Sequence, residues 1–313
     1  MKKNKKEILI LSILIIMFSI MITPKTLQND TFFAIAGGKR VIEYGLEEVD
    51  RLTWHENLKF TNDRYIFDII ITLAYNLFNF FGVYIVVAIF SVIIGLVFYY
   101  LLLKRNINYI LSFFSTIFVM YMGKGIIAAR AQIVSILIFI IEVYCIEKLL
   151  ETNSKRYFIS LIILPLILAN THASIFLVYF IFFLPYIAEA ILYKMAFVKN
   201  DGDKIYIKKR KNIKSLIIIM ILGILCGLCT PIGEAPFTSM IKASKGISAD
   251  IISELQPIVV IDSIEFMSLN IIFIAILAFT KTKINIFKNI FGIDKVKVFI
   301  NGEEIPVNRI KDS

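Results

Sequence analysis

The chain has 313 residues, of which 58% are hydrophobic, with a mean hydropathy of +0.79 and a net charge of +10. Soluble domains contain about 45–50% apolar residues, so this composition excludes an ordinary soluble enzyme and predicts a helical membrane protein. No aromatic-interleaved basic module accompanies the basic excess, and we therefore expect no nucleic-acid partner. Phosphate loops, GxSxG elbows and dinucleotide fingerprints are also absent from the sequence.

The first predicted element is an apolar helix that follows the basic start MKKNKKE. A cleaved signal peptide is one interpretation, but the A-x-A triplet at 34–36 lies too far beyond the apolar run. We therefore predict an uncleaved signal anchor over 8–23, with the preceding lysines in the cytoplasm.

A large first outer loop, 24–81, is expected next. Asp30 stands in an Asn-Asp-Thr string, where it is a candidate N-cap for a short helix over 31–45. The stretch 65–81 carries a polar stripe with Ile, Leu and Phe opposite it, which predicts an amphipathic helix over 64–80 lying flat on the outer membrane surface. The members of this stripe are Asp68, Thr72, Asn76 and Asn79.

Further apolar runs predict the remaining membrane spans, for about eight in all. They cover 82–103, 108–123, 126–147, 157–169, 172–193, 215–230 and 265–280. This arrangement leaves most of the 34 Lys and Arg residues on the cytoplasmic side, as the positive-inside rule requires. The predicted fold is thus an all-α, polytopic bundle in a bacterial plasma membrane, with both termini in the cytoplasm.

The predicted transmembrane domain covers 1–281 and includes a basic cytoplasmic loop, 194–214, and an outer loop, 231–264. A basic cytoplasmic tail, 282–313, follows, in which Val296–Ile300 and the next two residues, Asn-Gly, predict a small hairpin.

Three features inside the apolar runs have structural interpretations. The Cys226-x-x-Cys229 spacing is interpreted as helix packing rather than as a redox or metal site. Glu142 and Glu189 lie toward cytoplasmic helix ends, where we expect their carboxylates to reach the interface.

Polar residues gather on the outer side in this topology. Asn170, Thr171 and His172 form a predicted tight outer turn, Lys124 lies in a Gly-Lys-Gly turn, and AARAQ, residues 128–132, opens a descending helix. The candidate site residues are Asp30, Lys124, Arg130, Gln132, Asn170, His172 and Glu254. The structural alternatives are a helix-capping His172 and an interfacial anchor at Arg130.

This layout resembles the GT-C superfamily of integral-membrane glycosyltransferases, which take sugars from polyprenyl-phosphate donors. The resemblance covers roughly residues 1–280. It rests on DTFFAIAGGKRVIEYG after the first helix, on RYIFDIIITLAYNLFNFFG before the next span, and on AARAQIVS, LANTHASIF and TPIG…ISELQP. Many members carry two adjacent acids in the first loop, whereas Asp30 is flanked here by Asn29 and Thr31.

The resemblance implies an enzyme of the hexosyltransferase type and a role for each residue. Asp30 would act as general base on the acceptor hydroxyl. Arg130, with Lys124 and His172, would face the donor phosphate. Hydrogen bonds to sugar hydroxyls would come from Gln132, Asn170 and Glu254. No cofactor and no metal are predicted, because one acid and scattered histidines make a poor ligand set.

The expected partners are the lipid bilayer, a lipid-linked sugar donor, and an acceptor that is a glycan, a lipid or a protein. Two other functions remain open. One is a transporter or flippase of a lipid-linked saccharide, although such proteins keep polar sites near the membrane midplane. The other is a non-catalytic, truncated membrane homologue.

Overall fold

The computed structural model describes residues 5–26, 28–47, 49, 61–194, 211–245, 298–300 and 303–305. Over these residues the chain is helical apart from one small hairpin, in agreement with the predicted all-α class. The α-helices are α1 (Lys5–Ile22), α2 (Asn29–Tyr44), α3 (Tyr65–Lys104), α4 (Tyr109–Met122), α5 (Gln132–Thr152), α6 (Lys155–Thr171), α7 (Phe176–Ile181), α8 (Leu184–Lys194), α9 (Ile213–Cys226) and α10 (Ala235–Lys245). Two 3₁₀ helices, η1 (Lys124–Ile126) and η2 (Ala173–Ile175), and two strands, β1 (Val298–Ile300) and β2 (Glu303–Ile305), complete the description.

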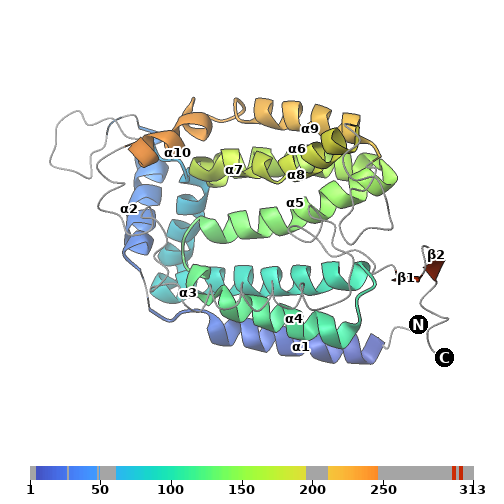
Figure 1. Ribbon diagram of the computed structural model, residues 1–313. Coiled ribbons are helices and arrows are strands. Elements are labelled where there is room, and N and C mark those ends of the chain that lie inside the picture. Colours follow the sequence, from blue (N-terminus) through green and yellow to red (C-terminus); the bar gives the residue numbers. More distant parts are fainter. Residues whose placement is uncertain are drawn as a thin grey trace.

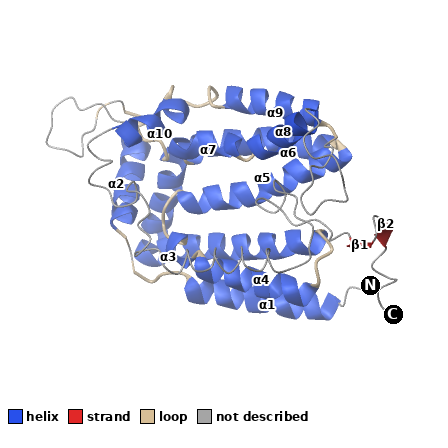
Figure 2. Cartoon of the chain, viewed as in Figure 1, coloured by secondary structure: helices blue, strands red, loops and turns tan. Residues whose placement is uncertain are grey.

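The long helices lie side by side, and the chain reverses direction between successive ones (Figure 1). α1, the later part of α3, α4, α5, α6 and α9 share one axis, whereas α2 and the first part of α3 cross one end of this bundle (Figures 1 and 2). Apolar side chains fill the interior, with Ile15, Val83, Ile146 and Leu168 among the most buried. The crossing helices therefore cover a single end of the bundle, opposite the start of α1.

A sharp kink divides α3 into these two parts. Phe78 (φ −137°, ψ 21°) and Asn79 (φ 52°, ψ −143°) leave helical geometry, close to the predicted boundary between 65–81 and 82–103. A Cβ at Gly82 would overlap the carbonyl group of Ala74, so glycine lets the chain turn back tightly here. The kink converts one continuous apolar sequence into a crossing helix and a bundle helix.

Two glycines let α2 lie directly on the first part of α3. A Cβ at Gly38 would overlap the backbone of Asp68 and the hydroxyl group of Thr72, and one at Gly37 would meet the Asp68 carboxylate. The Thr72 hydroxyl donates a hydrogen bond to the Ile35 carbonyl at 3.0 Å. Asp68 and Thr72 are fully buried, so this half of the predicted polar stripe faces α2.

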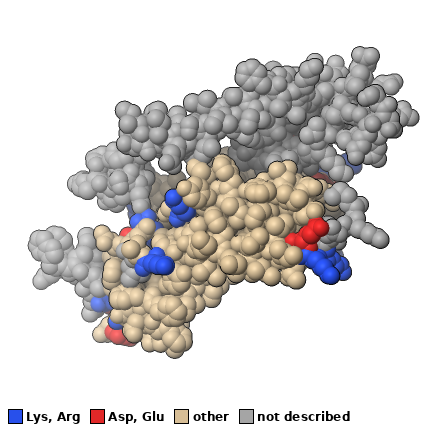
Figure 3. Space-filling model, turned by 90° about the horizontal axis from the view of Figure 1, so that it is seen from below, with Lys and Arg blue, Asp and Glu red and all other residues tan. Residues whose placement is uncertain are grey.

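Two helical stretches are long and apolar enough to cross a membrane, α3 and Ala173–Tyr193. After the kink, residues 80–104 of α3 measure about 37 Å at 1.5 Å per residue, which exceeds the hydrocarbon thickness of a bilayer. Most of the described surface in Figure 3 is free of charged side chains, which gather toward its two ends. The described residues thus give the chain the character of a membrane protein.

Several predicted boundaries and environments were wrong. α2 begins at Asn29 with Gln28 as its N-cap, so Asp30 lies in the first turn and is not the cap. α5 begins at Gln132 instead of 126, because 3₁₀ and bent backbone precede it. Asn170 and Thr171 belong to the end of α6. Glu142 and Glu189 are fully buried and do not reach the bundle surface.

The hairpin prediction is confirmed for the described strands. β1 pairs with β2 in antiparallel register, with Val298 opposite Ile305 and Ile300 opposite Glu303. The cysteines are free thiols, and the Cys226 thiol donates to the Ile162 carbonyl at 3.5 Å. This contact between α9 and α6 supports the helix-packing interpretation. Residues 265–280, predicted to span, lie outside the described residues.

Candidate functional site

The candidate site lies at the end of the bundle that α2 and the first part of α3 cross (Figure 1). Asp30, in the first turn of α2, forms an ion pair with Arg130, with 2.9 Å between Oδ2 and Nε. The Asp30 side chain is 42% exposed and that of Arg130 22%. A carboxylate at a helix N-terminus is also favoured by the helix dipole. The carboxylate and the guanidinium are thus held together within reach of solvent.

Small side chains bring Arg130 to this position. Ala128, Ala129 and Ala131 are buried on the bent segment between η1 and α5. The Arg130 amide donates to the Ala128 carbonyl at 2.8 Å, and the Arg130 carbonyl accepts from Ile133 at 3.1 Å. Because the alanines pack inward, the segment lies close to the bundle while Arg130 reaches Asp30.

His172 ends α6 and is buried. Its Nδ1 lies 2.8 Å from the hydroxyl oxygen of Ser135, in the first turn of α5. Burial, with a smaller effect from the nearby Arg64 guanidinium, lowers the pKa of His172 from 6.5 to about 4. The imidazole is therefore neutral at pH 7. It can donate or accept a hydrogen bond there but cannot supply a positive charge to a phosphate.

A second acidic and basic cluster, not anticipated from the sequence, lies beside His172. Arg64 pairs with Asp68 at 3.4 Å and covers the Phe33 ring at 5.2 Å. The Asn62 amide donates to the Asp68 carboxylate at 3.0 Å. Burial raises the pKa of Asp68 from 3.8 to about 7 against the lowering effects of Arg64 and Asn62. The only sequence signal for this cluster was the polar stripe that includes Asp68.

The same cluster is connected to the α6–η2 junction. The backbone carbonyl of Asp63 accepts a hydrogen bond from the Ala173 amide at 2.7 Å. The Asp63 carboxylate bonds to Ser174, and burial raises the pKa of Asp63 above 3.8. These bonds fasten the start of α3 to the bundle next to His172.

Asn170 is used in a structural connection. Its side-chain oxygen accepts from the Tyr65 hydroxyl at 2.6 Å. Its amide nitrogen donates to the carbonyls of Leu166, at 2.8 Å, and Cys229, at 3.3 Å. Asn170 thereby joins α3, α6 and the chain after α9, and its predicted contact with a sugar remains a prediction.

The other candidates are not brought into the Asp30–Arg130 contact. The Lys124 ammonium lies 4.5 Å from the centre of the Tyr121 ring, on an exposed turn. Gln132 is the half-buried first residue of α5. Glu254 lies outside the described residues. Within the described parts of the chain, no three His, Cys, Asp or Glu side chains gather as metal ligands.

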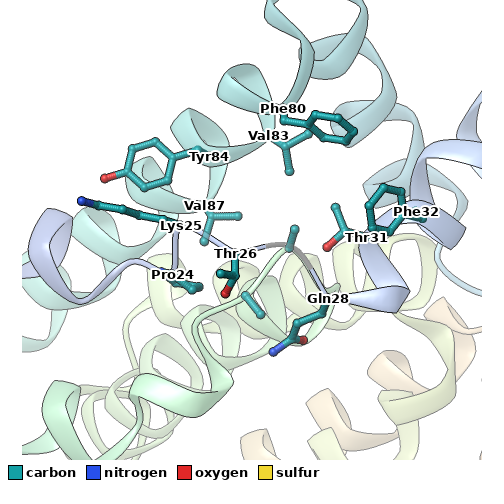
Figure 4. A pocket seen from close by; sticks show the side chains of 12 residues that line it. Pro24, Lys25, Thr26, Gln28, Thr31, Phe32, Phe80, Val83, Tyr84 and Val87 are labelled. Carbon is teal, nitrogen blue, oxygen red and sulfur yellow. The ribbon is translucent and has the colours of Figure 1, made fainter.

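A cavity of about 530 Å³ lies between the α1–α2 connection, the start of α2, α3 and the segment before α5. Its polar members include Lys25, which the sequence analysis missed because no motif surrounds it. Lys25 and Tyr84 lie on one side, and Thr31 and Phe32 lie on the opposite side (Figure 4). The cavity is lined by Pro24, Lys25, Thr26, Gln28, Thr31, Phe32, Phe80, Val83, Tyr84, Val87, Ala128 and Ala129.

Two lining residues are sequence neighbours of the paired side chains. Thr31 follows Asp30 directly, and Ala129 immediately precedes Arg130. Consecutive Cα atoms are about 3.8 Å apart, so the backbone of both paired residues adjoins the cavity, while the lining itself comes from their neighbours. The Asp30–Arg130 pair is thus adjacent in sequence to a space that both apolar and polar side chains line. Comparisons with protein-family models, with curated proteins and with solved structures found no match to this chain.

Proposed function

We propose that the chain is a multi-pass membrane glycosyltransferase that acts at the outer face of a bacterial plasma membrane. The donor is a sugar linked to polyprenyl phosphate, and the acceptor carries a hydroxyl group. The single observation that supports this best is the ion pair between Asp30 and Arg130 beside the cavity. Such a transfer needs a carboxylate that accepts the proton of the acceptor hydroxyl and a cation that stabilises the leaving phosphate.

In the proposed reaction the Asp30 carboxylate removes the proton of the acceptor hydroxyl. The acceptor oxygen forms a bond to the anomeric carbon, while the bond from that carbon to the phosphate oxygen breaks. The leaving polyprenyl phosphate keeps the electron pair. A guanidinium has five N–H donors, so Arg130 can hold Asp30 through Nε and donate from other nitrogens to the phosphate. His172, being neutral, contributes an N–H donor at most.

The proposed topology has about eight spans, with Asp30, Arg130 and His172 on the outer side. The chain reversals in Figure 1 bring the end of α3 and the start of α6 to the end of the bundle opposite the site. These helix ends carry Lys104 and Lys155, as expected for cytoplasmic turns. Reporter fusions after Lys104, Ser154, Lys209 and Lys283 should all report cytoplasm. An outward signal at Lys209 would refute this topology.

The enzyme proposal is tested by comparing Asp30→Asn with Arg130→Lys and Arg130→Gln in a strain that lacks the gene. Cell-envelope glycans are then measured by mass spectrometry. We expect no restoration by Asp30→Asn, and more restoration by Arg130→Lys than by Arg130→Gln because lysine keeps the charge. Full restoration by Asp30→Asn, at equal protein levels, would exclude Asp30 as the base.

A transporter of a lipid-linked saccharide is the second candidate, and one observation favours it. Glu142 lies mid-way along α5, fully buried, and both of its carboxylate oxygens lack a hydrogen-bond partner among the described residues. Buried ionisable groups in membrane helices are often functional. If Glu142→Gln abolishes glycan restoration and Asp30→Asn does not, the transporter replaces the enzyme as the preferred function.

A further inference from the structure

We propose that the cavity between the α1–α2 connection and α3 binds a lipid whose head group carries both a phosphate and a hydroxyl group. At about 530 Å³ it lies within the 300–1,000 Å³ typical of ligand sites. This inference concerns binding alone and does not depend on the proposed reaction.

The apolar side of the cavity comes from a helix that is long enough to cross the membrane. Val83 and Val87 of α3 are buried at its wall. Phe80 meets Phe32 of α2 edge to face, with 5.8 Å between ring centres. Outside the cavity, Phe81 is 65% exposed and stacks on Tyr84 at 6.3 Å. Apolar surface therefore continues from the cavity to the exterior, as a lipid chain requires.

The polar side supplies a cation and an unsatisfied acceptor. Lys25 is exposed at the rim, where an ammonium can pair with a phosphate. The side-chain oxygen of Gln28 is buried and has no hydrogen-bond partner among the described residues. A buried acceptor without a donor is unfavourable. Gln28 also lines the cavity (Figure 4), so a rotation of its amide group would bring this oxygen to a hydroxyl group on the ligand.

The binding test uses the purified full-length chain and native mass spectrometry with four probes. Dioleoyl-phosphatidylglycerol has a phosphate and hydroxyls, dioleoyl-phosphatidylmethanol has only the phosphate, and dioleoylglycerol has only a hydroxyl. A polyprenyl-phosphate-linked hexose is the fourth probe. We expect phosphatidylglycerol to bind about tenfold more tightly than either of the two single-feature lipids, as expected for one lost polar contact.

Two variants separate the polar contacts. Lys25→Gln should weaken the binding of both phosphate-bearing glycerolipids about tenfold. Lys39→Gln, at an exposed lysine of α2 beside Tyr75, should leave the binding of both lipids unchanged. Gln28→Met should abolish the preference for phosphatidylglycerol over phosphatidylmethanol. Equal effects of the two lysine variants, or an unchanged preference in Gln28→Met, would overturn the proposal.

A third variant tests whether the lipid binds in this cavity, without changing a core residue. Thr26 is exposed and lines the cavity, so Thr26→Trp should fill it and block binding while thermal unfolding is retained. Undiminished binding in a folded Thr26→Trp protein would overturn the assignment of this cavity.

The fourth probe identifies the source of the ligand. Tighter binding of the hexose donor than of phosphatidylglycerol would make the cavity a site for the donor of the proposed reaction. The reverse order would make it a site for a membrane phospholipid. Binding of phosphatidylglycerol is measured without any transfer reaction, so failure of the glycosyltransferase proposal is distinguishable from failure of this one.

Discussion

Asp30 and Arg130 lie a hundred positions apart in the sequence, yet their side chains form an ion pair 2.9 Å long at the covered end of the bundle. Both side chains are partly exposed, and ion pairs in such positions contribute only about 0–1 kcal/mol to stability. Replacing either residue should therefore change stability little, so variants of the pair should separate activity from folding.

We expect Asp30→Asn to lower the free energy of unfolding by less than about 1 kcal/mol. It should lower the proposed glycosyl transfer about 100-fold or more, because the proposed general base is lost. Thermal unfolding in detergent and a transfer assay measure the two effects. Glu234→Gln is the matched control, since Glu234 forms a separate exposed ion pair with Lys242. Equal transfer by both variants would contradict the role of Asp30.

Asp68 should make stability fall as pH rises. Burial raises the pKa of Asp68 from 3.8 to about 7, so between these values the folded state holds a proton that the unfolded state releases. Stability from this group is complete below pH 3.8 and is lost as pH approaches 7, with a slope of about 1.4 kcal/mol per pH unit. Asp68→Asn should remove this contribution, so that the stability of the variant falls less with rising pH than that of the wild type when unfolding is measured from pH 4 to 8. A slope unchanged by Asp68→Asn would assign it to other groups.

His172 should make stability rise as pH rises. Its pKa is lowered from 6.5 to about 4 by burial and by Arg64, so stability from the neutral imidazole is complete above pH 6.5 and is lost as pH falls toward 4. His172→Gln should flatten this acid-side loss in the same unfolding series. In the wild type the two groups partly cancel between about pH 4 and 6.5, so each variant should expose the slope of the other group. Parallel curves for the two variants would refute this interpretation.

Gly38→Ala should destabilise the fold by about 1–3 kcal/mol, because the added methyl group overlaps the Asp68 backbone and the Thr72 hydroxyl. Gly125→Ala is the control, since a Cβ there meets nothing within 4 Å. Chemical unfolding of both variants checks the expectation. If the two substitutions cost the same, α2 does not lie on α3 as described.

Asn79→Gly should leave stability unchanged or raise it by up to about 1 kcal/mol, whereas Asn79→Val should lower it by about 1–3 kcal/mol. The reason is the positive φ of 52° at the kink of α3, which glycine adopts without strain and a β-branched residue does not. Melting temperatures of the two variants test this. A more stable Asn79→Val protein would mean that α3 is continuous.

The sequence predicted well the features that follow from hydrophobic patterning. The apolar runs located the described bundle helices, and the Asn-Gly pair at 301–302 located the hairpin that β1 and β2 form. Grouping the outer turns on one side brought Asp30 and Arg130 into one candidate site, and these two side chains do make contact. Their exact pairing depends on helix crossings, which one sequence does not specify.

Contacts made by isolated residues could not be predicted. The polar stripe of Asp68 and Thr72 has the same spacing whether it faces water or a second helix. In the folded chain it faces a second helix, α2, because Gly38 allows the two helices to approach closely. Asn170 in a turn gives no hint of its three hydrogen-bond partners. Lys25 has no pattern around it, so only the folded chain relates it to a cavity.

The bond between the Asp63 carbonyl and the Ala173 amide, at 2.7 Å, fastens the crossing part of α3 to the bundle. The hydrogen bond from Thr72 to Ile35 fastens α2 to that part in turn. Moving either helix aside would break these hydrogen bonds. Lys25 and Thr26, in the α1–α2 connection, are exposed and line the cavity. We therefore expect a lipid that binds at the proposed site to enter the cavity from the bilayer past these two residues.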